Sequence, residues 1–458
     1  MAMGRQRDRQ GEMLLSWDEL PKSPGHVFYD RLQEVLLDNG FDGFVEGLGK
    51  PYYAPVMGAR SLPPGRYFRM HLVGYFEGIH SERGLEWRCT DSLSLREFLR
   101  LGVREAVPDH SWLSKTRGRL PLEVHDAVFA WVLGRLAERN LVKGERIGID
   151  ASTMEANAAM RSIQRRDSGE SYRAMLTRMA EASGIPTPTA AELKQLDRTR
   201  KGKRVRNAEW VSPSDPDARI TRLKDGRTRL AYKPEHAVDL DTEAIVAATI
   251  HPADQGDTTT IAGTLEAATR GLDAAGLAPS AEAPAELVAD KGYHSRAVLK
   301  DLADGPWQTR IAEPRPKEVQ RWHGDLDARR AVYRNRARLR SGIGKEGFAL
   351  RAEKVERSFE HNLDRGGMRR TWLRGRENVQ KRYLIQVAAY NLGLVMRALL
   401  GAGTPKAAAA RGGGLIWLAA STAGLVILII VPPNTPPDPT SSTAYRLRNL
   451  SELPRTPA

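Results

Sequence analysis

Residues 145–150 read ERIGID, a short apolar run that ends in an acid, and the pattern returns in AELVAD at 285–290. Aliphatic runs of this length, bounded by polar residues, favour buried strands. Between them, RLAYKPEHAVDLD (229–241) and EAIVAATIHP (243–252) predict two more strands, and TTTIAGTLEAATRGLDAAG (258–276) predicts a helix. This order predicts an α/β fold with a mixed sheet.

Composition and the spacing of apolar residues divide the chain into three regions. Residues 25–140 carry apolar side chains at helical spacing, as in PPGRYFRMHLVGYFEGI (63–79), and predict a helical N-terminal domain. The α/β domain then spans 141–405, with an insertion at about 160–228 that is rich in Ser, Gly, Pro and basic residues. Residues 406–458 form an apolar and proline-rich tail that we expect to lie outside the fold.

The charge balance indicates a polyanionic partner. Lys and Arg number 70 against 56 Asp and Glu, which gives a net charge of +14. Nucleic acid is the first expectation for such a partner, and an acidic membrane surface is the second. The single cysteine, Cys89, excludes internal disulfides and cysteine-rich zinc sites. With no apolar signal segment at the N-terminus, we expect a cytoplasmic protein.

The apolar segment LIWLAASTAGLVILIIV (415–431) has two interpretations. Its 17 residues lie at the low edge of the length that spans a bilayer. The flanking glycines and prolines favour an appended tail or a poorly packed apolar helix. We expect no membrane partner and give the segment no weight in the functional argument.

Two basic segments are candidates for contact with DNA. Ser94 and Glu97 predict the start of a helix that ends at Gly102, and residues 109–121, DHSWLSKTRGRLP, predict a second helix after it, the outline of a helix-turn-helix. Its basic residues are Lys115, Arg117 and Arg119. The insertion carries a dense basic run that includes Lys201, Lys203 and Arg204. The insertion is either a flexible, solvated segment or a loop that follows a phosphate backbone.

Two acids follow buried strands directly. Asp150 comes after Ile147–Ile149, and Asp290 comes after Leu287–Ala289. Ligands of open α/β sheets bind beyond the carboxyl ends of the strands, where two carboxylates repel unless a cation lies between them. Mg²⁺ prefers oxygen ligands, and a pair of ions can activate a hydroxyl and stabilise a leaving oxygen. The alternative is that each acid only caps a turn or helix.

A third carboxylate is expected from RAEKVERSFEHNLDRGGMRRTWLRG, residues 351–375. On an ideal helix one apolar arc packs on the sheet, formed by Ala352, Val355, Phe359 and Leu363. Glu356 lies about 60° from the middle of this arc, and we expect it to be partly buried near the strand ends. Three acids lie further from the arc: Glu353, Glu360 and Asp364. Gly366 and Gly367 end the helix. The alternative interpretation, an amphipathic helix whose charged residues are simply solvated, fits the same helical-wheel projection.

At these residues the sequence resembles the DDE transposases of bacterial insertion sequences. GIDAST (148–153), VADKGYHS (288–295) and VERSFEHNLDRGGMRRTWLRG (355–375) resemble the three acidic blocks of that family. NVQKRYLIQVAAYNLGLVMRALLG (378–401) resembles its closing helix, and residues 66–120 resemble the helical N-terminal domain of one branch.

The resemblance implies an RNase H-like domain with a site for two Mg²⁺ or Mn²⁺ ions held by Asp150, Asp290 and Glu356. It implies cleavage of double-stranded DNA at the ends of a mobile element and transfer of the freed 3′ hydroxyl to target DNA, by a homodimer or larger assembly. Two positions depart from the family: Leu363 stands where many relatives have Lys or Arg, and Ala352 where many have Arg. A decayed protein that only binds DNA therefore remains an alternative.

Further residues are candidates for contact with DNA. Near Asp290 they are Lys291, Tyr293 and His294, and near Glu356 they are Arg357, Arg369, Arg370 and Arg374. Trp210 and Trp372 are candidates for stacking on an unpaired base, although packing in the core is the alternative for both. His236 is a candidate for facing the site, but we expect it in the core or on the surface, and we expect Asp254 and Asp257 in turns or caps.

Overall fold

The computed structural model describes residues 26–54, 61–102, 104–202, 205–223, 225–315, 322, 324–411, 415–416 and 429–430. Contacts divide the chain into one unit of residues 1–408 and a second of residues 409–458. In the second unit, β10 (Leu415–Ile416) pairs antiparallel with β11 (Ile429–Ile430). The rest of the apolar segment 415–431 lies outside the described residues, so both of its interpretations stay predictions.

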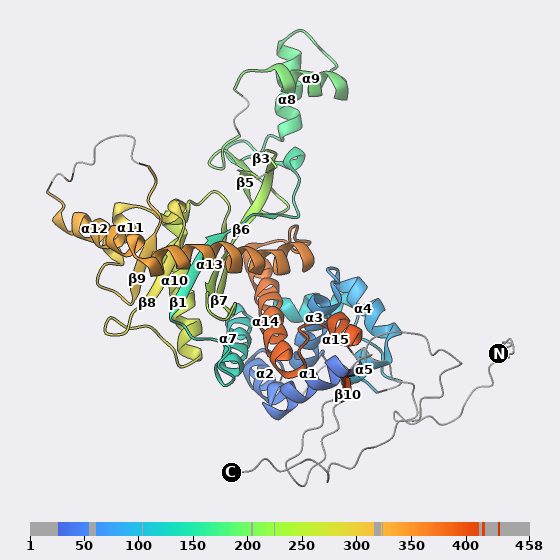
Figure 1. Cartoon of the computed structure of the whole chain (residues 1–458). Coiled ribbons are helices and arrows are strands. Elements are labelled where there is room, and N and C mark those ends of the chain that lie inside the picture. The colour runs from blue at the N-terminus through green and yellow to red at the C-terminus, as the bar shows by residue number, and fades with distance from the viewer. Residues whose placement is uncertain are drawn as a thin grey trace, which may run out of the picture. The chain divides into compact units, whose positions relative to one another are not determined.

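A mixed sheet forms the centre of the first unit (Figure 1). β6 pairs antiparallel with β1 and with β7, whereas β1 is parallel to β8 and β8 to β9. The strands are β1 (Arg146–Ala151), β6 (Thr228–Asp239), β7 (Ile245–Pro252), β8 (Ala285–Ala289) and β9 (Trp307–Ile311), with β2 (Met154–Glu155) and β5 (Arg219–Arg222) added along β6. The predicted strands are confirmed, and the topology is that of an RNase H-like fold.

Helices cover both faces of the sheet. α10 (Asp257–Ala274) packs on β6 and β7, and α13 (Gly342–Phe359) packs on β1, β6 and β8. Because side chains alternate along a strand, neighbouring residues of β6 meet different helices. The other helices of this part are η4 (Lys291–Tyr293), α11 (Arg296–Asp301), α12 (Leu326–Arg340), the π-helical η5 (Glu360–Arg365), α14 (Arg376–Leu400) and α15 (Pro405–Arg411).

Buried asparagines close the two edges of the sheet. On β7, the amide of Asn391 both donates to and accepts from the backbone of Ile245, and on β9 Asn335 does the same with Ile311. Edge strands expose unpaired backbone groups that invite pairing with other chains. Here helices α14 and α12 supply the missing partners.

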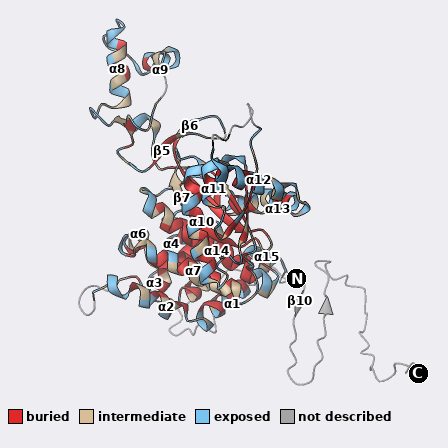
Figure 2. Ribbon diagram, turned by 90° about the vertical axis from the view of Figure 1, so that its left-hand side faces the viewer, coloured by how far each residue is buried: buried red, intermediate tan, exposed pale blue. Residues whose placement is uncertain are grey.

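The N-terminal region is helical, as predicted, but it shares its core with the sheet domain. α14 packs on α7 and α3, and one continuous apolar core runs through both parts, visible as the buried interior in Figure 2. The elements are α1 (His26–Asp38), α2 (Phe41–Gly49), η2 (Lys50–Tyr52), α3 (Pro64–Glu77), α4 (Glu82–Asp91), α5 (Leu93–Phe98), α6 (His110–Arg119) and α7 (Leu122–Ala137). The helical stretch Arg376–Arg411, which comprises α14 and α15, is long and apolar enough to span a membrane, but 72% of its apolar window is buried inside the protein.

The helix-turn-helix outline is wrong. Residues 99–109 separate α5 from α6, whereas such motifs join their helices by a turn of three or four residues. Arg117 is also buried on the inner side of α6, where it forms an ion pair with Glu82. The prediction was wrong because the sequence indicated two helices but did not show that the first one ends as early as Phe98.

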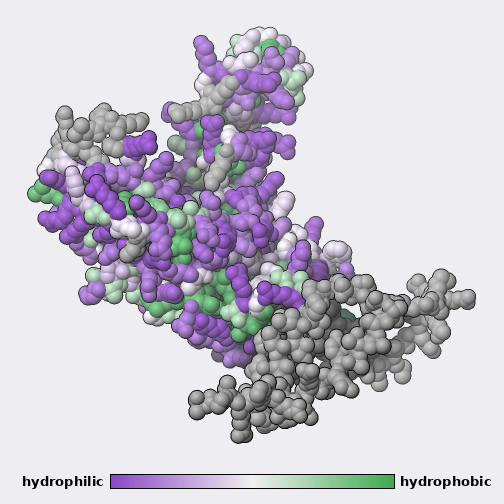
Figure 3. All heavy atoms as spheres, in the orientation of Figure 1, coloured by the Kyte–Doolittle hydropathy of each residue, from purple (hydrophilic) through white to green (hydrophobic). Residues whose placement is uncertain are grey.

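The insertion is folded, so its interpretation as a flexible loop is wrong. It contains η3 (Met160–Ser162), β3 (Gln164–Arg165), α8 (Tyr172–Ala182), α9 (Ala190–Thr199) and β4 (Trp210–Val211). α8 and α9 bury a separate apolar cluster of Leu176, Ala180 and Leu193. Hydrophilic side chains cover most of this part in Figure 3. In the sequence, the basic run follows α9 directly.

Candidate active site

Asp150 and Asp290 lie side by side at the carboxyl ends of two parallel strands. β1 and β8 pair up to Ile149 and Ala289, so the next residue on each strand is an acid. Asp290 caps η4, and its Oδ1 accepts a hydrogen bond from the amide of Gly292 at 2.8 Å. The strand pairing thus brings together the first two predicted acids.

Asp150 is held by a cation from the neighbouring helix. Nη1 of Arg351 lies 2.7 Å from Oδ2 of Asp150, and the amide of Ala151 donates to Oδ1 at 2.8 Å. Burial raises the pKa of Asp150 and the nearby charge of Asp290 adds to the rise, while Arg351 opposes both. The two carboxylates therefore repel each other, which favours a cation between them.

Glu356 projects from the same helix, but it is exposed rather than partly buried. The helical wheel misplaced the packing face, since Ala352 is also exposed and Ser358 is fully buried. The regular α-helix ends at Phe359 and continues as the π-helical η5 as far as Arg365. A π-turn adds a residue to each turn, so 100° steps fail beyond this point.

A cavity of about 550 Å³ lies beside Asp150 and Glu356. Thr153, Glu155, Glu360, Asp364 and Arg369 also line it. Acids and arginines face the same hollow, which suits a ligand that carries phosphates together with cations.

The donor set fits a hard divalent cation, but the residues do not form a closed cage. Among the described residues, no group of three or more His, Cys, Asp or Glu side chains is close enough together to hold a metal ion. Asp150 and Asp290 offer carboxylate oxygens at adjacent positions, and Glu356 stands on the helix that covers them. The structure thus places two carboxylates next to each other and a third on the helix that faces them.

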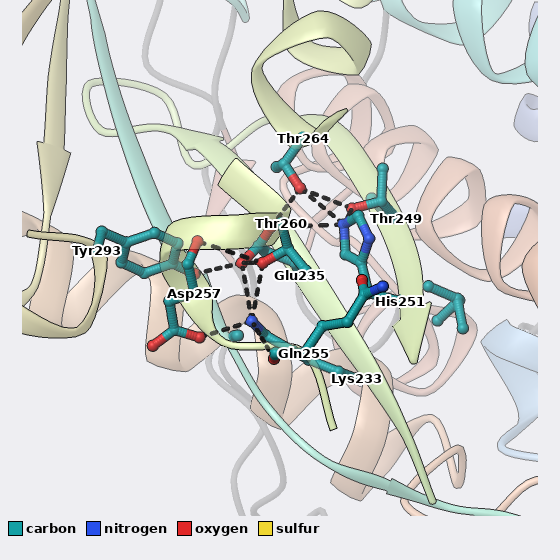
Figure 4. A network of polar contacts seen from close by, with 12 residues as sticks. Lys233, Glu235, Thr249, His251, Gln255, Asp257, Thr260, Thr264 and Tyr293 are labelled. Carbon is teal, nitrogen blue, oxygen red and sulfur yellow. Dashed lines mark hydrogen bonds and ion pairs between the residues drawn. The ribbon is translucent and has the colours of Figure 1, made fainter. Parts of the chain in front are cut away.

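The block that follows Asp290 is tied to a buried polar network on the α10 face of the sheet (Figure 4). The Tyr293 hydroxyl donates to Oε1 of Glu235 at 2.6 Å, and both side chains are fully buried. Burial by itself raises the pKa of Glu235, but hydrogen bonds from His251, Thr264 and Tyr293 and the charge of Lys233 outweigh it and lower this pKa. Glu235 is therefore held ionised, and Tyr293 is unavailable for the predicted contact with DNA.

Lys233 completes this network. Its Nζ lies 2.6 Å from Oδ1 of Asp257, 2.8 Å from Oγ1 of Thr260 and 3.7 Å from Oε1 of Glu235. Asp257 belongs to the first turn of α10, as predicted for a cap region. Its other oxygen lies so close to Gly292 that a Cβ added there would be 2.3 Å away. A side chain at position 292 would therefore require the Asp257 carboxylate, which is ion-paired with Lys233, to move.

His236 forms a second buried contact, on the α13 face. Its Nδ1 lies 2.8 Å from Oγ of Ser358 and its Nε2 lies 2.7 Å from the Tyr383 hydroxyl. Ser358 donates its own hydrogen to the carbonyl of Val355, so it accepts from Nδ1–H, and the neutral ring accepts from Tyr383 at Nε2. Burial lowers the pKa of His236 to about 3. This histidine is a core residue, one of the two places expected for it.

The predicted cations fall into two groups. Several are paired within the protein: Arg357 with Glu243 and Glu353, Arg369 with Asp364 and Ser152, and Arg370 more loosely with Glu155. Lys115 and Arg119 lie over the rings of Trp112 and Tyr53. His294 is half-buried, whereas exposed positions are held by Lys201, Lys291 and Arg374. Lys203 and Arg204 lie outside the described residues.

The two candidate tryptophans also differ in exposure, since one is buried and the other is exposed. Trp210 is buried against Tyr172, so its stacking on a base is ruled out in this structure. The Trp372 side chain is 59% exposed, with the guanidinium of Arg370 5.4 Å from its ring centre. Of the two, Trp372 alone offers a face to a ligand. Sequence reasoning did not single out Arg351, Lys233 or Glu235, because only pairing across the fold reveals their partners.

Two family models match the chain. The model described as "Transposase DDE domain" matches residues 217–392, and the "Transposase domain (DUF772)" matches residues 16–119. The chain belongs to the DDE transposases of bacterial insertion sequences. Asp290 and Glu356 lie within the match to the DDE domain, and Asp150 precedes it. Curated proteins and solved structures yield no significant match to this transposase.

Proposed function

We propose that this transposase cuts double-stranded DNA at the ends of its element and transfers the freed strands to target DNA, using Asp150, Asp290 and Glu356. The observation that carries the proposal is the adjacency of Asp150 and Asp290 at the ends of parallel strands, beneath the helix that bears Glu356. Acidic residues placed in this way suit divalent cations, for which we propose two Mg²⁺ or Mn²⁺ ions.

The ions, when bound, would activate the attacking hydroxyl and stabilise the leaving oxygen of the phosphodiester. The residues of the chain have separate tasks. Asp150 and Asp290 offer oxygens from fixed strand ends, while Glu356 approaches from the rim of the cavity. Arg369, bound to Ser152 and Asp364, and the exposed Arg374 would contact the DNA backbone.

The proposed partner and location follow from charge and family. Insertion residues 160–228 contain 16 Lys and Arg against nine Asp and Glu, and so carry +7 of the net +14. A phosphate backbone is the ligand such a surface favours. We further propose that the protein acts in the bacterial cytoplasm at the nucleoid, as a homodimer or larger assembly on DNA.

Cleavage of the element's own end sequences tests the proposal. We expect Asp150→Asn, Asp290→Asn and Glu356→Gln each to reduce Mg²⁺-dependent cleavage by at least about a thousandfold, because each removes a charged ligand of the reacting centre. Two exposed acids of α13 that do not line the cavity serve as matched controls, Glu346→Gln and Glu353→Gln. Equal losses in the controls, or intact cleavage in Glu356→Gln, would show that the assignment is wrong.

The alternative is a decayed transposase that binds DNA without cutting it. The departure at Leu363, which is fully buried here, motivates it. Calorimetric titration of the intact protein with Mn²⁺ separates the two. Absence of metal binding together with retained DNA binding would favour the alternative.

A further inference from the structure

Two neighbouring residues of β6 contact the two segments that carry Asp290 and Glu356. In the antiparallel pairing of β1 with β6, His236 lies opposite Asp150 and Glu235 lies opposite Ala151. Because successive side chains of a strand point to opposite faces, Glu235 enters the α10 side and His236 the α13 side. The strand that pairs with Asp150 therefore holds one polar anchor on each face.

The first anchor holds the block after Asp290. Glu235 accepts the hydroxyl of Tyr293, three residues beyond Asp290, and it also accepts hydrogen bonds from Thr260 and Thr264. A fully buried carboxylate is stable only when its oxygens are satisfied, so this position of Tyr293 is strongly determined. Asp257, in the first turn of α10, lies close to Gly292. The block is thus fixed between β6 and α10.

The second anchor holds the helix of Glu356. His236 donates to Ser358, two residues beyond Glu356, and its ring stacks on Phe359 with centroids 4.2 Å apart. Tyr383 of α14 fixes the other ring nitrogen at 2.7 Å. The rotation of α13 about its axis is therefore set by a hydrogen bond that starts on β6.

We propose that Glu235 and His236 are positioning residues that place the Asp290 block and the Glu356 helix against Asp150. Neither side chain lines the cavity beside Asp150 and Glu356. They act by setting the distances between three acids that come from separate segments, in the way that second-sphere partners orient metal ligands. This inference rests on the proposed function, because it assigns the three acids to one site.

The test removes one hydroxyl at a time. Tyr293→Phe breaks the first anchor and Ser358→Ala the second. Tyr232→Phe is the matched control, because this buried hydroxyl on β6 donates to the buried carboxylate of Asp215 at 2.7 Å. All three variants remove a hydroxyl at a buried site, so a general loss of stability would appear in each.

Two readouts are measured, amide exchange by mass spectrometry without metal and Mn²⁺ affinity by calorimetry. We expect faster exchange in 289–296 for Tyr293→Phe and in 355–365 for Ser358→Ala. We also expect Mn²⁺ affinity to be roughly tenfold weaker in both variants, and unchanged in Tyr232→Phe.

The outcomes separate the positioning role from the proposed function. If Tyr293→Phe and Ser358→Ala match Tyr232→Phe in exchange and in metal affinity, the positioning role is wrong even where cleavage occurs. If the unmodified protein neither binds Mn²⁺ nor cleaves DNA, the proposed function fails. The exchange pattern then still tests whether Glu235 and His236 fix these segments.

Discussion

Nη1 of Arg351 lies 2.7 Å from Oδ2 of Asp150, and the same helix carries Glu356 five residues further along. Arg351 is largely buried, at 14% exposed, so its charge is only partly screened. The guanidinium and a bound divalent cation are therefore competitors for the same carboxylate. This relationship leads to the first prediction.

We predict that Arg351→Gln strengthens metal binding and weakens DNA binding. Loss of the competing cation makes the site more negative, and we expect Mn²⁺ affinity to rise roughly three- to tenfold. The affinity for DNA falls because one positive group near the scissile phosphate is gone. Calorimetry with Mn²⁺ and a filter-binding assay with end DNA measure the two effects. Weaker metal binding in Arg351→Gln would contradict the prediction.

Stability should fall as the pH is lowered from 7.5 to 5.0. Burial lowers the pKa of His236 to about 3 and that of His125 to about 4, so in the folded protein both stay neutral in this range. The unfolded chain binds their protons below about pH 6.5, and stability therefore rises with pH in this window. Each histidine accounts for about 2 kcal/mol of the difference between pH 7.5 and pH 5.0.

Urea unfolding at the two pH values measures this difference. His236→Gln removes one of the groups, so its difference should be smaller by about 2 kcal/mol, whatever the absolute stability of the variant. Tyr232→Phe provides the control, because it removes a buried hydroxyl but no histidine. If the stability of His236→Gln changes between pH 7.5 and pH 5.0 by as much as that of the unmodified protein, the His236 ring is not held neutral.

The basic run of the insertion should bind DNA without regard to sequence. We predict that changing Lys201, Lys203 and Arg204 together to Ala lowers the affinity for end and random duplexes equally. For each of these three cations that binds a phosphate, its loss should make the slope of log K against log salt shallower by about 0.9. Arg178→Ala is the control, since Arg178 is already paired with Glu170. An effect confined to end sequences would contradict this role.

Trp372 should stack on an unpaired base. Its side chain is 59% exposed, and the ring lies beside Arg370 in the loop that follows η5. We expect Trp372→Ala to weaken binding to a duplex with a frayed end by about tenfold and to leave binding to a closed duplex unchanged, because stacking contributes about 1–3 kcal/mol per base. Trp87→Ala, at a tryptophan of similar exposure, is the control. Equal effects of the two variants would remove the assignment.

Much of the fold was predictable from the sequence. ERIGID and AELVAD predicted two buried strands, and the structure adds that these strands pair in parallel. The helix of residues 351–365 was also predictable, but its exposed face was not. Ala352 is exposed and Ser358 is buried, because the helix packs through a hydrogen bond to His236 as well as through apolar contacts.

The charged residues show where prediction from sequence fails. Arg117 looked like a contact for DNA and is buried beside Glu82, 35 positions earlier in the chain. Tyr293 looked like a contact for phosphate and donates to Glu235, 58 positions earlier. A sequence shows that a polar group exists, but the partner of a buried group depends on which segments pack together.

By itself, the sequence determined the α/β order, the basic charge and the acids that end two strands, because these follow from local periodicity and composition. Only the tertiary structure decided that Asp150 meets Arg351, that Glu356 stays exposed, and that Glu235 and His236 contact the other two acidic segments. Those relationships depend on long-range contacts between buried polar groups, and no local pattern encodes them.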